Sequence, residues 1–287
     1  MSDPGALLAK ADKKAAGGGG FSLFGGGSSR LEEAADLYIQ AANSFRIQSK
    51  QEDAARAFQK AAETQLKTDE KDDAANSYIE AFKCYRRERP EEAIGMLEKA
   101  IHLFTAKGGF RRAANYQMDL GQIYEDMSDL KNAMTCYDTA SEWYANDQAD
   151  ALANKATLKT AELAAMGGDY ARGFAGFERV ARASLNNNLT KYSVKDYFFR
   201  AGLCRFADGD DVGSNRAVQQ YAELDPTFVS TREFQLLQDI SQSIEDANQE
   251  AFTDKIFQYD QMSKLDKWKT AILLKIKNSI ADEPSLT

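Results

Sequence analysis

Three eight-residue stretches decide the fold: residues 34–41 read AADLYIQA, residues 54–61 read AARAFQKA and residues 74–81 read AANSYIEA. Each has alanine at both ends and an aromatic side chain at the fifth position. Positions i, i+4 and i+7 lie along one face of an α-helix, so each stretch predicts one helix with small residues where a neighbour comes close. With the weaker copies that follow, the first positions step by 19 or 20 residues: 34, 54, 74, 93, 113, 133, 153 and 173.

Two such units predict an antiparallel helical hairpin of about forty residues, longer than the roughly 34 residues of a tetratricopeptide (TPR) repeat. Local signals agree, because Pro90 is typical of a first helical position and Ser128-Asp129 of a helix cap. The segment LGQIY at residues 120–124 also resembles the Leu-Gly-x-x-Tyr element of TPR motifs. Stacked hairpins of this kind would bury a continuous core and leave two broad faces.

The repeat ends after Ala183, where the polar run SLNNN at residues 184–188 predicts a loop. A last helix is expected over Leu265–Ala281, with one apolar stripe. The predicted fold class is therefore all-α: a TPR-like α-hairpin solenoid, forming a twisted sheet of helices, followed by a C-terminal helical bundle. We expect an N-terminal helix and apolar loop over residues 1–29, repeats over residues 30–188 and the bundle over residues 189–287.

The charge is unevenly distributed. The net charge of −8 argues against non-specific nucleic-acid binding, because affinity for a polyanion depends on Lys and Arg. Between Glu223 and Asp260 nine acidic residues stand against two basic ones, which places most of the negative charge in the predicted bundle. Opposite ends of the chain are thus predicted to meet partners of opposite sign.

Residue types that carry chemistry are scarce. His102 is the only histidine and is expected to be a core or half-buried side chain, so neither a catalytic triad nor a zinc site has support. No phosphate-binding loop motif occurs. The three cysteines lie in apolar helical patterns and predict buried thiols in a reducing compartment. We expect no enzyme activity, no cofactor, no metal, and a cytoplasmic protein that is at most peripherally attached to membranes.

Residues 17–29 read GGGGFSLFGGGSS and hold Phe21, Leu23 and Phe24, hereafter the apolar triad, between two glycine tethers. One interpretation is that the triad packs onto the nearest hairpin as a small satellite cluster. The other is an apolar fingertip for a membrane or a partner, helped by nearby lysines. Three large apolar side chains would give weak, reversible membrane binding, as a single lipid chain does.

Several ordered blocks resemble one known family. Residues 191–199 (KYSVKDYFF), residues 264–277 (KLDKWKTAILLKIK) and the FSLFGG loop are similar to the alpha-SNAP family of soluble NSF attachment proteins. This resemblance implies a non-enzymatic adaptor that binds assembled SNARE complexes, then recruits and stimulates the hexameric NSF AAA+ ATPase for SNARE disassembly in vesicle fusion. It also implies that the apolar triad is a membrane loop.

The resemblance further implies site residues. The SNARE four-helix bundle is expected to contact Lys155, Lys159, Leu189, Tyr192, Lys195 and Arg232. The ATPase is expected to dock on Glu245, Asp246 and Leu286. A family lysine is replaced by Asn115, so its charge must be absent or supplied by Arg111 or Arg112. We call Lys155 and Lys159 the basic pair, and Glu245 and Asp246 the acidic pair.

A second function class stays open. A generic TPR-like scaffold that binds peptides, as co-chaperones do, would also explain the hairpins. It predicts a groove for one extended peptide and gives no role to the apolar triad. Binding of an assembled SNARE complex in preference to its separate chains would distinguish the two.

Overall fold

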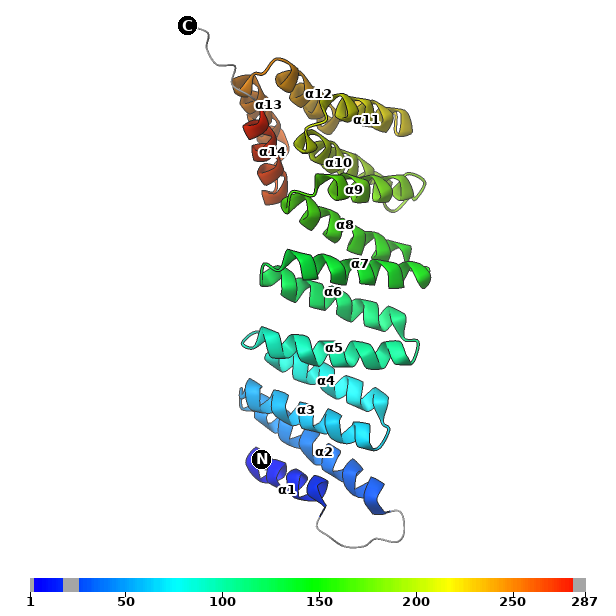
Figure 1. The fold of residues 1–287 in the computed structure, drawn as a ribbon, viewed down its shortest axis with the longest axis vertical. Helices are drawn as coiled ribbons and strands as arrows, with labels where there is room; N and C mark the ends of the chain where they lie inside the picture. Colours follow the sequence, from blue (N-terminus) through cyan, green and yellow to red (C-terminus); the bar gives the residue numbers. More distant parts are fainter. Residues whose placement is uncertain (1–2, 18–25, 281–287) are drawn as a thin grey trace. The chain divides into compact units, whose positions relative to one another are not determined.

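The computed structural model describes residues 3–17 and 26–280, and these residues form α-helices and short 3-10 turns without any β-strand (Figure 1). This confirms the all-α, TPR-like fold class. None of the helices in these ranges has the length and apolar character needed to cross a membrane. The helices are α1 (Pro4–Ala16), α2 (Gly26–Ile47), α3 (Gln51–Lys67), α4 (Lys71–Tyr85), α5 (Pro90–Ala106), α6 (Phe110–Asp126), α7 (Leu130–Asn146), α8 (Asp150–Met166), α9 (Tyr170–Ser184), α10 (Val194–Asp208), α11 (Asp211–Leu224), α12 (Arg232–Glu245), α13 (Gln249–Met262) and α14 (Lys267–Ser279).

The chain divides into two compact units, one ending at Ala149 and one beginning at Asp150. In the N-terminal unit each helix from α1 to α6 packs against the next along the chain, up to α7. In the C-terminal unit α10 is central and contacts α9, α11, α12 and α14. The boundaries predicted at residues 29 and 188 follow a different criterion, the sequence repeat, and stay predictions.

The predicted small-residue positions are buried where helices pack together. Ala34, Ala54, Ala74, Ala93, Ala113 and Ala133 are all fully buried in the N-terminal unit. In the C-terminal unit a Cβ atom on Gly173 would lie only 3.1 Å from the Ala165 Cβ and 3.2 Å from the Cys204 Sγ. The repeat thus exists because neighbouring backbones approach at one point in every helix, where a larger side chain would not fit.

Short turns connect the helices, and one residue in many of them has a left-handed backbone. Gly108 and Gly168 adopt φ values of 76° and 89°, which glycine tolerates without strain. The same conformation occurs at Ser49, Asp69, Ser128 and Gln148. Asp129 then caps α7 as predicted, its side chain accepting a hydrogen bond from the Asn132 amide at 3.1 Å.

An aromatic core holds the C-terminal unit together. Phe198 on α10 stacks on Tyr221 of α11 with ring centroids 4.6 Å apart, and Phe228 packs beside it. The predicted apolar stripe of the last helix is buried at Ile272, Ile276 and Ile280. The helix itself begins two residues later than predicted, at Lys267, because the Asp266 side chain caps it.

The structure differs from two expectations and agrees with a third. His102 is exposed on α5, so the expectation of a core or half-buried histidine was wrong. The cause is its place on the helix, since Ile101 and Phe104 face the core and His102 lies between them on the outer side. Residues 26–29 belong to α2, although the composition had suggested a flexible tether there. The three cysteines are buried and unpaired, as expected.

Candidate partner-binding surfaces

The basic pair lies on α8 in the C-terminal unit. Lys155 is exposed and Lys159 is half-buried, one helical turn apart on the same face. Glu162 continues this stripe, and its carboxylate pairs with the Arg200 guanidinium of α10 at 3.0 Å. Lys155 itself forms no ion pair with any residue that the structure describes. Its charge is therefore available to an external partner.

Arg200 ties this part of α8 to α10 and α14. Besides Glu162, it pairs with Asp196 at 2.8 Å and with Asp266 at 3.0 Å, and it lies 5.1 Å from the centre of the Trp268 ring. Burial alone would raise the pKa of Asp196, but a hydrogen bond from Lys269 and the Arg200 charge hold that pKa below its usual value. The network fixes the helices that carry the predicted site residues.

Leu189 and Tyr192 are the most exposed large apolar side chains of the described chain, at 91% and 77%. They lie in the loop between α9 and α10, where the Asn187 side chain accepts a hydrogen bond from the Leu189 amide at 2.9 Å. Lys191 lies 5.4 Å from the Tyr192 ring centre. Tyr192 also lines a cavity of about 410 Å³ together with residues of α11 and its following turn. This exposure is costly in water and typical of a surface that a partner covers.

The other two predicted basic contacts differ in how free their charges are. Lys195 pairs with Glu233 at 3.3 Å, so part of its charge is already neutralised. Arg232, at the start of α12, donates to the Met262 carbonyl and the Ser263 hydroxyl, both at 3.3 Å. Within residues 3–17 and 26–280 it has no carboxylate partner, so Arg232 retains a free positive charge.

The acidic pair lies at the end of α12, and both carboxylates are exposed. Glu245 accepts from the Asn215 side chain at 3.2 Å, while Asp246 accepts from Gln242 at 3.0 Å. Three other acidic residues of the predicted negative segment are engaged by lysines: Glu233, Asp239 and Asp260. Within the described ranges, the acidic residues of this segment without a lysine partner are the acidic pair, Glu250 and Asp254 on the following helix, and Glu223 and Asp225 at the end of α11.

A second source of negative charge, not predicted from the sequence, lies at the start of α11. The hydrogen bond from Asn215 of α11 to Glu245 shows that the start of α11 lies close to the acidic pair. Burial, Asp210 and Glu245 raise the pKa of Asp211 there. The acidic run DGDD at residues 208–211 could have suggested this negative charge. The sequence alone did not show that the helix following this run lies beside α12. Asp210 also caps α11 by accepting from the Gly213 amide at 2.9 Å.

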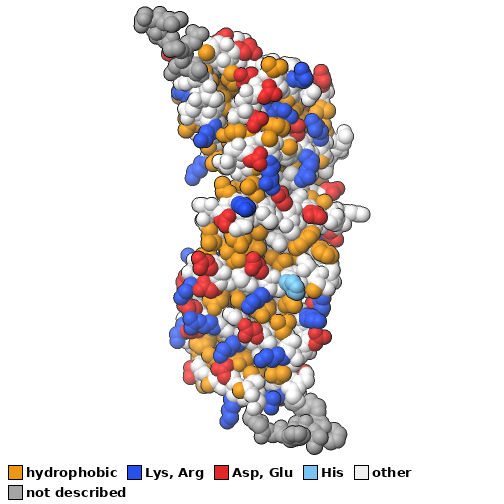
Figure 2. Space-filling view, in the orientation of Figure 1, with side chains coloured by type: hydrophobic (Ala, Val, Ile, Leu, Met, Phe, Trp, Pro, Cys, Tyr) orange, Lys and Arg blue, Asp and Glu red, His pale blue; other side chains and the backbone are white. Residues whose placement is uncertain are grey.

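The position where the resemblance implies a family lysine is occupied by Asn115 on α6, in the N-terminal unit. Asn115 accepts a hydrogen bond from the buried Tyr144 hydroxyl at 2.6 Å, a role that a lysine ammonium cannot take because it has no acceptor. Arg111 lies 3.5 Å from Asp147, and Arg112 donates to Asn76 at 2.7 Å. Figure 2 shows basic and acidic side chains interspersed on the visible face of this unit.

Two predicted features lie outside the described residues: the apolar triad and Leu286. His102 lines a surface groove of about 430 Å³ over α6, between α5 and α7, beside Asn132 and Thr135. No group of three or more histidine, cysteine or acidic side chains in the described ranges is arranged to hold a metal ion.

Comparisons with known proteins decide the family. The family model described as "Soluble NSF attachment protein, SNAP" matches residues 2–281. The chain belongs to the soluble NSF attachment protein family. It is 56% identical to the probable vesicular-fusion protein sec17 homolog of Schizosaccharomyces pombe, over all of both chains. It is 40% identical to the alpha-soluble NSF attachment protein of Saccharomyces cerevisiae, over 99% of this chain and 98% of the relative. With the human alpha-soluble NSF attachment protein the identity is 37%, over 98% and 96%.

Membership of the soluble NSF attachment protein family confirms the predicted resemblance. The family consists of non-enzymatic adaptors, which confirms that the chain is not an enzyme, and its adaptor function in vesicle fusion is confirmed at this level. A solved structure of a signal-transduction ATPase with a TPR sensor from Pyrococcus horikoshii supports the fold alone. It has a TM-score of 0.52 and 15% identity, and the match covers 97% of this chain and 44% of that chain.

Proposed function

We propose that this adaptor binds assembled SNARE complexes through the C-terminal unit and recruits an NSF-type ATPase through the acidic pair. The observation that carries the first half is the exposure of Leu189 and Tyr192 in one loop. Two apolar side chains open to water beside lysines suit a helix bundle that is acidic at its surface and offers apolar contacts. Lys155 and Arg232 add unneutralised positive charge to the same unit.

The second half rests on the local charge. The acidic pair, with Asp210 and Asp211 nearby, gives the end of α12 a negative surface that would attract a basic domain and orient it. Separate positive and negative surfaces let one chain hold a substrate and an ATPase together. Attachment to membranes through the apolar triad, and residence in the cytoplasm, are part of this proposal.

The deciding experiment measures binding of a soluble assembled SNARE complex and of its separate chains. We expect selective binding of the complex, and weaker binding when both lysines of the basic pair are changed to glutamate, with the difference shrinking as salt is added. A matched control changes Lys67 and Lys131, two exposed lysines of the N-terminal unit, to glutamate. Equal losses from both double variants would attribute the effect to total charge and contradict the proposed site.

One observation favours the alternative of a generic peptide-binding scaffold. The groove over α6 is lined by polar side chains, including Gln117, Asn132 and Thr135, that could hydrogen-bond an extended backbone. Under this alternative, the separate SNARE chains would bind as tightly as the complex. Substitutions along the groove would then weaken binding while those of the basic pair would not.

A further inference from the structure

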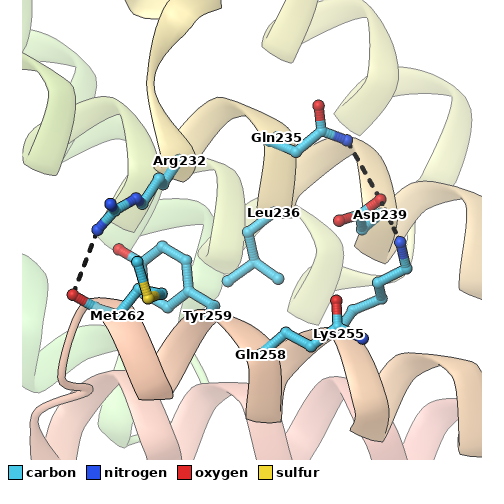
Figure 3. A pocket seen from close by; sticks show the side chains of 8 residues that line it. All are labelled: Arg232, Gln235, Leu236, Asp239, Lys255, Gln258, Tyr259 and Met262. Atoms are coloured by element: carbon cyan, nitrogen blue, oxygen red, sulfur yellow. Dashed lines mark hydrogen bonds and ion pairs between the residues drawn. The ribbon is translucent and has the colours of Figure 1, made fainter.

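A compact pocket of about 180 Å³ lies between α12 and α13 of the C-terminal unit. Figure 3 shows Arg232 and Met262 at one end and Lys255 at the other, with Leu236 and Tyr259 between them. Arg232 lies at one end of the pocket and Leu236 at its floor. They are four residues apart on α12, which corresponds to a rise of about 6 Å along the helix axis.

The pocket has a buried apolar floor and one exposed apolar wall. Leu236 is 2% exposed and belongs to the core, whereas Met262 at the end of α13 is 66% exposed. Tyr259 is half-buried between them. The space is large enough for a single aliphatic side chain of leucine size, and too small for an aromatic drug-like ligand, since such pockets occupy roughly 300–1,000 Å³.

The two ends of the pocket differ in charge. At one end Lys255 is neutralised by Asp239 at 3.4 Å, which also accepts from Gln235 at 3.2 Å. At the other end the Arg232 guanidinium contacts only the neutral oxygens of Met262 and Ser263 among the described residues. The pocket is therefore lined by apolar side chains and by one cation, Arg232, that has no carboxylate partner in the part of the chain that the structure describes.

We propose that this pocket binds one aliphatic side chain of a partner helix, while a carboxylate one helical turn away on that helix pairs with Arg232. The inference rests on the proposed function, because the partner is then a helix of the SNARE complex. An aliphatic and an acidic residue at i and i+3 or i+4 of the partner lie about 5–6 Å apart, which is comparable with the rise of about 6 Å between Arg232 and Leu236 along α12. Arginine is suited to this role because its guanidinium can hold a carboxylate with two hydrogen bonds.

The test fills the pocket in the full-length protein. Gln258 lines the pocket from α13 and is exposed, so Gln258→Trp should occupy the cavity without disturbing the core. We expect affinity for a soluble assembled SNARE complex, measured by calorimetry, to fall about tenfold, the loss that exclusion of one buried aliphatic side chain predicts. The matched control is Gln261→Trp, which adds the same side chain to α13 outside the pocket lining and should change the affinity less than about twofold.

A second variant distinguishes a blocked pocket from a misfolded protein as the cause of weaker binding. Met262→Ala removes the exposed wall of the pocket and should also weaken binding, with an unchanged unfolding temperature. If Gln258→Trp binds as tightly as the unmodified chain, the pocket has no occupant in the complex and the inference is wrong.

A double-variant cycle tests whether one partner helix engages both features. Arg232→Gln should weaken binding mostly at low salt. In the double variant with Gln258→Trp, the fold-loss of affinity should be smaller than the product of the two separate fold-losses. Effects that multiply fully would show that the cavity and Arg232 act on different parts of the partner.

The outcome also separates this inference from the function on which it rests. If the unmodified chain fails to bind the assembled complex, the proposed function fails. If it binds, and reversing the basic pair weakens binding while Gln258→Trp does not, only the pocket assignment is lost.

Discussion

Replacing Gly121 with alanine should destabilise the N-terminal unit, although alanine is the better helix former. Gly121 lies inside α6, where alanine would be favoured by about 1 kcal/mol on helix propensity alone. The new Cβ atom, however, would lie 2.6 Å from the Cε1 atom and 2.9 Å from the Cδ1 atom of Tyr137 on α7. No carbon–carbon contact of that length is tolerated, so the ring or the helix must move.

The expected loss in the free energy of unfolding depends on how firmly Tyr137 is held in place. Its side chain is 1% exposed, and its hydroxyl donates to the Glu125 carboxylate at 2.9 Å. Inserting a methyl group into such a core costs about 1–3 kcal/mol, and loosening the hydrogen bond adds about 1 kcal/mol. Subtracting the helix-propensity gain of about 1 kcal/mol, we expect a net loss of about 1–3 kcal/mol in the free energy of unfolding.

Gly95→Ala is the matched control. Gly95 also lies inside a helix, α5, but a Cβ atom there would meet no heavy atom within 4 Å, so only the propensity gain of up to about 1 kcal/mol remains. Unfolding by heat, followed by circular dichroism, should show opposite shifts of the transition, each of a few degrees. Equal stabilisation of both variants would refute the packing explanation of the Leu-Gly-x-x-Tyr element.

Three further outcomes are expected. Serine at all three positions of the apolar triad should reduce binding to liposomes and disassembly of membrane-anchored SNAREs while sparing soluble SNAREs; equal losses on both would favour packing on the scaffold. Lysine at both positions of the acidic pair should abolish ATPase recruitment in a pull-down but leave SNARE binding intact, and normal recruitment at physiological salt would exclude the site. Asp196→Asn should destabilise the protein at neutral pH, and the difference in unfolding free energy should shrink as the pH falls below about 4, because a carboxyl with a lowered pKa contributes stability only while ionised. A difference that stays constant down to pH 2 would contradict the assigned ion pairs.

The helices and their spacing could be predicted because one physical constraint recurs. Wherever two backbones approach, as at Ala54 or Ala113, the sequence must supply a small residue, and that residue returns with each helix. The division at Ala149 has no such signal, since the repeat continues through Ala153 and Gly173. The exposure of His102 was mispredicted because a residue between two core positions can lie on either flank of a helix.

Charge in the candidate site was predictable only as a total. The sequence shows nine acidic residues in one segment, but not that Glu233, Asp239 and Asp260 lie beside lysines while the acidic pair stays open. These pairings join helices distant in sequence, as Lys195 and Glu233 do, and depend on how α10, α12 and α13 pack. The pocket beside Arg232 was unpredictable for the same reason.

The weak attachment of α13 has a consequence for the timing of events on this protein. Of its 14 residues, all of them described, only Phe252 is buried, whereas α10 buries eight. Amide protons of α13 should therefore exchange with solvent through frequent local opening, long before those of α10. A ligand bound between α12 and α13 would have to hold α13 against α12. Amide exchange in α13 would then slow, and the extent of slowing would report the fraction of protein that carries the ligand.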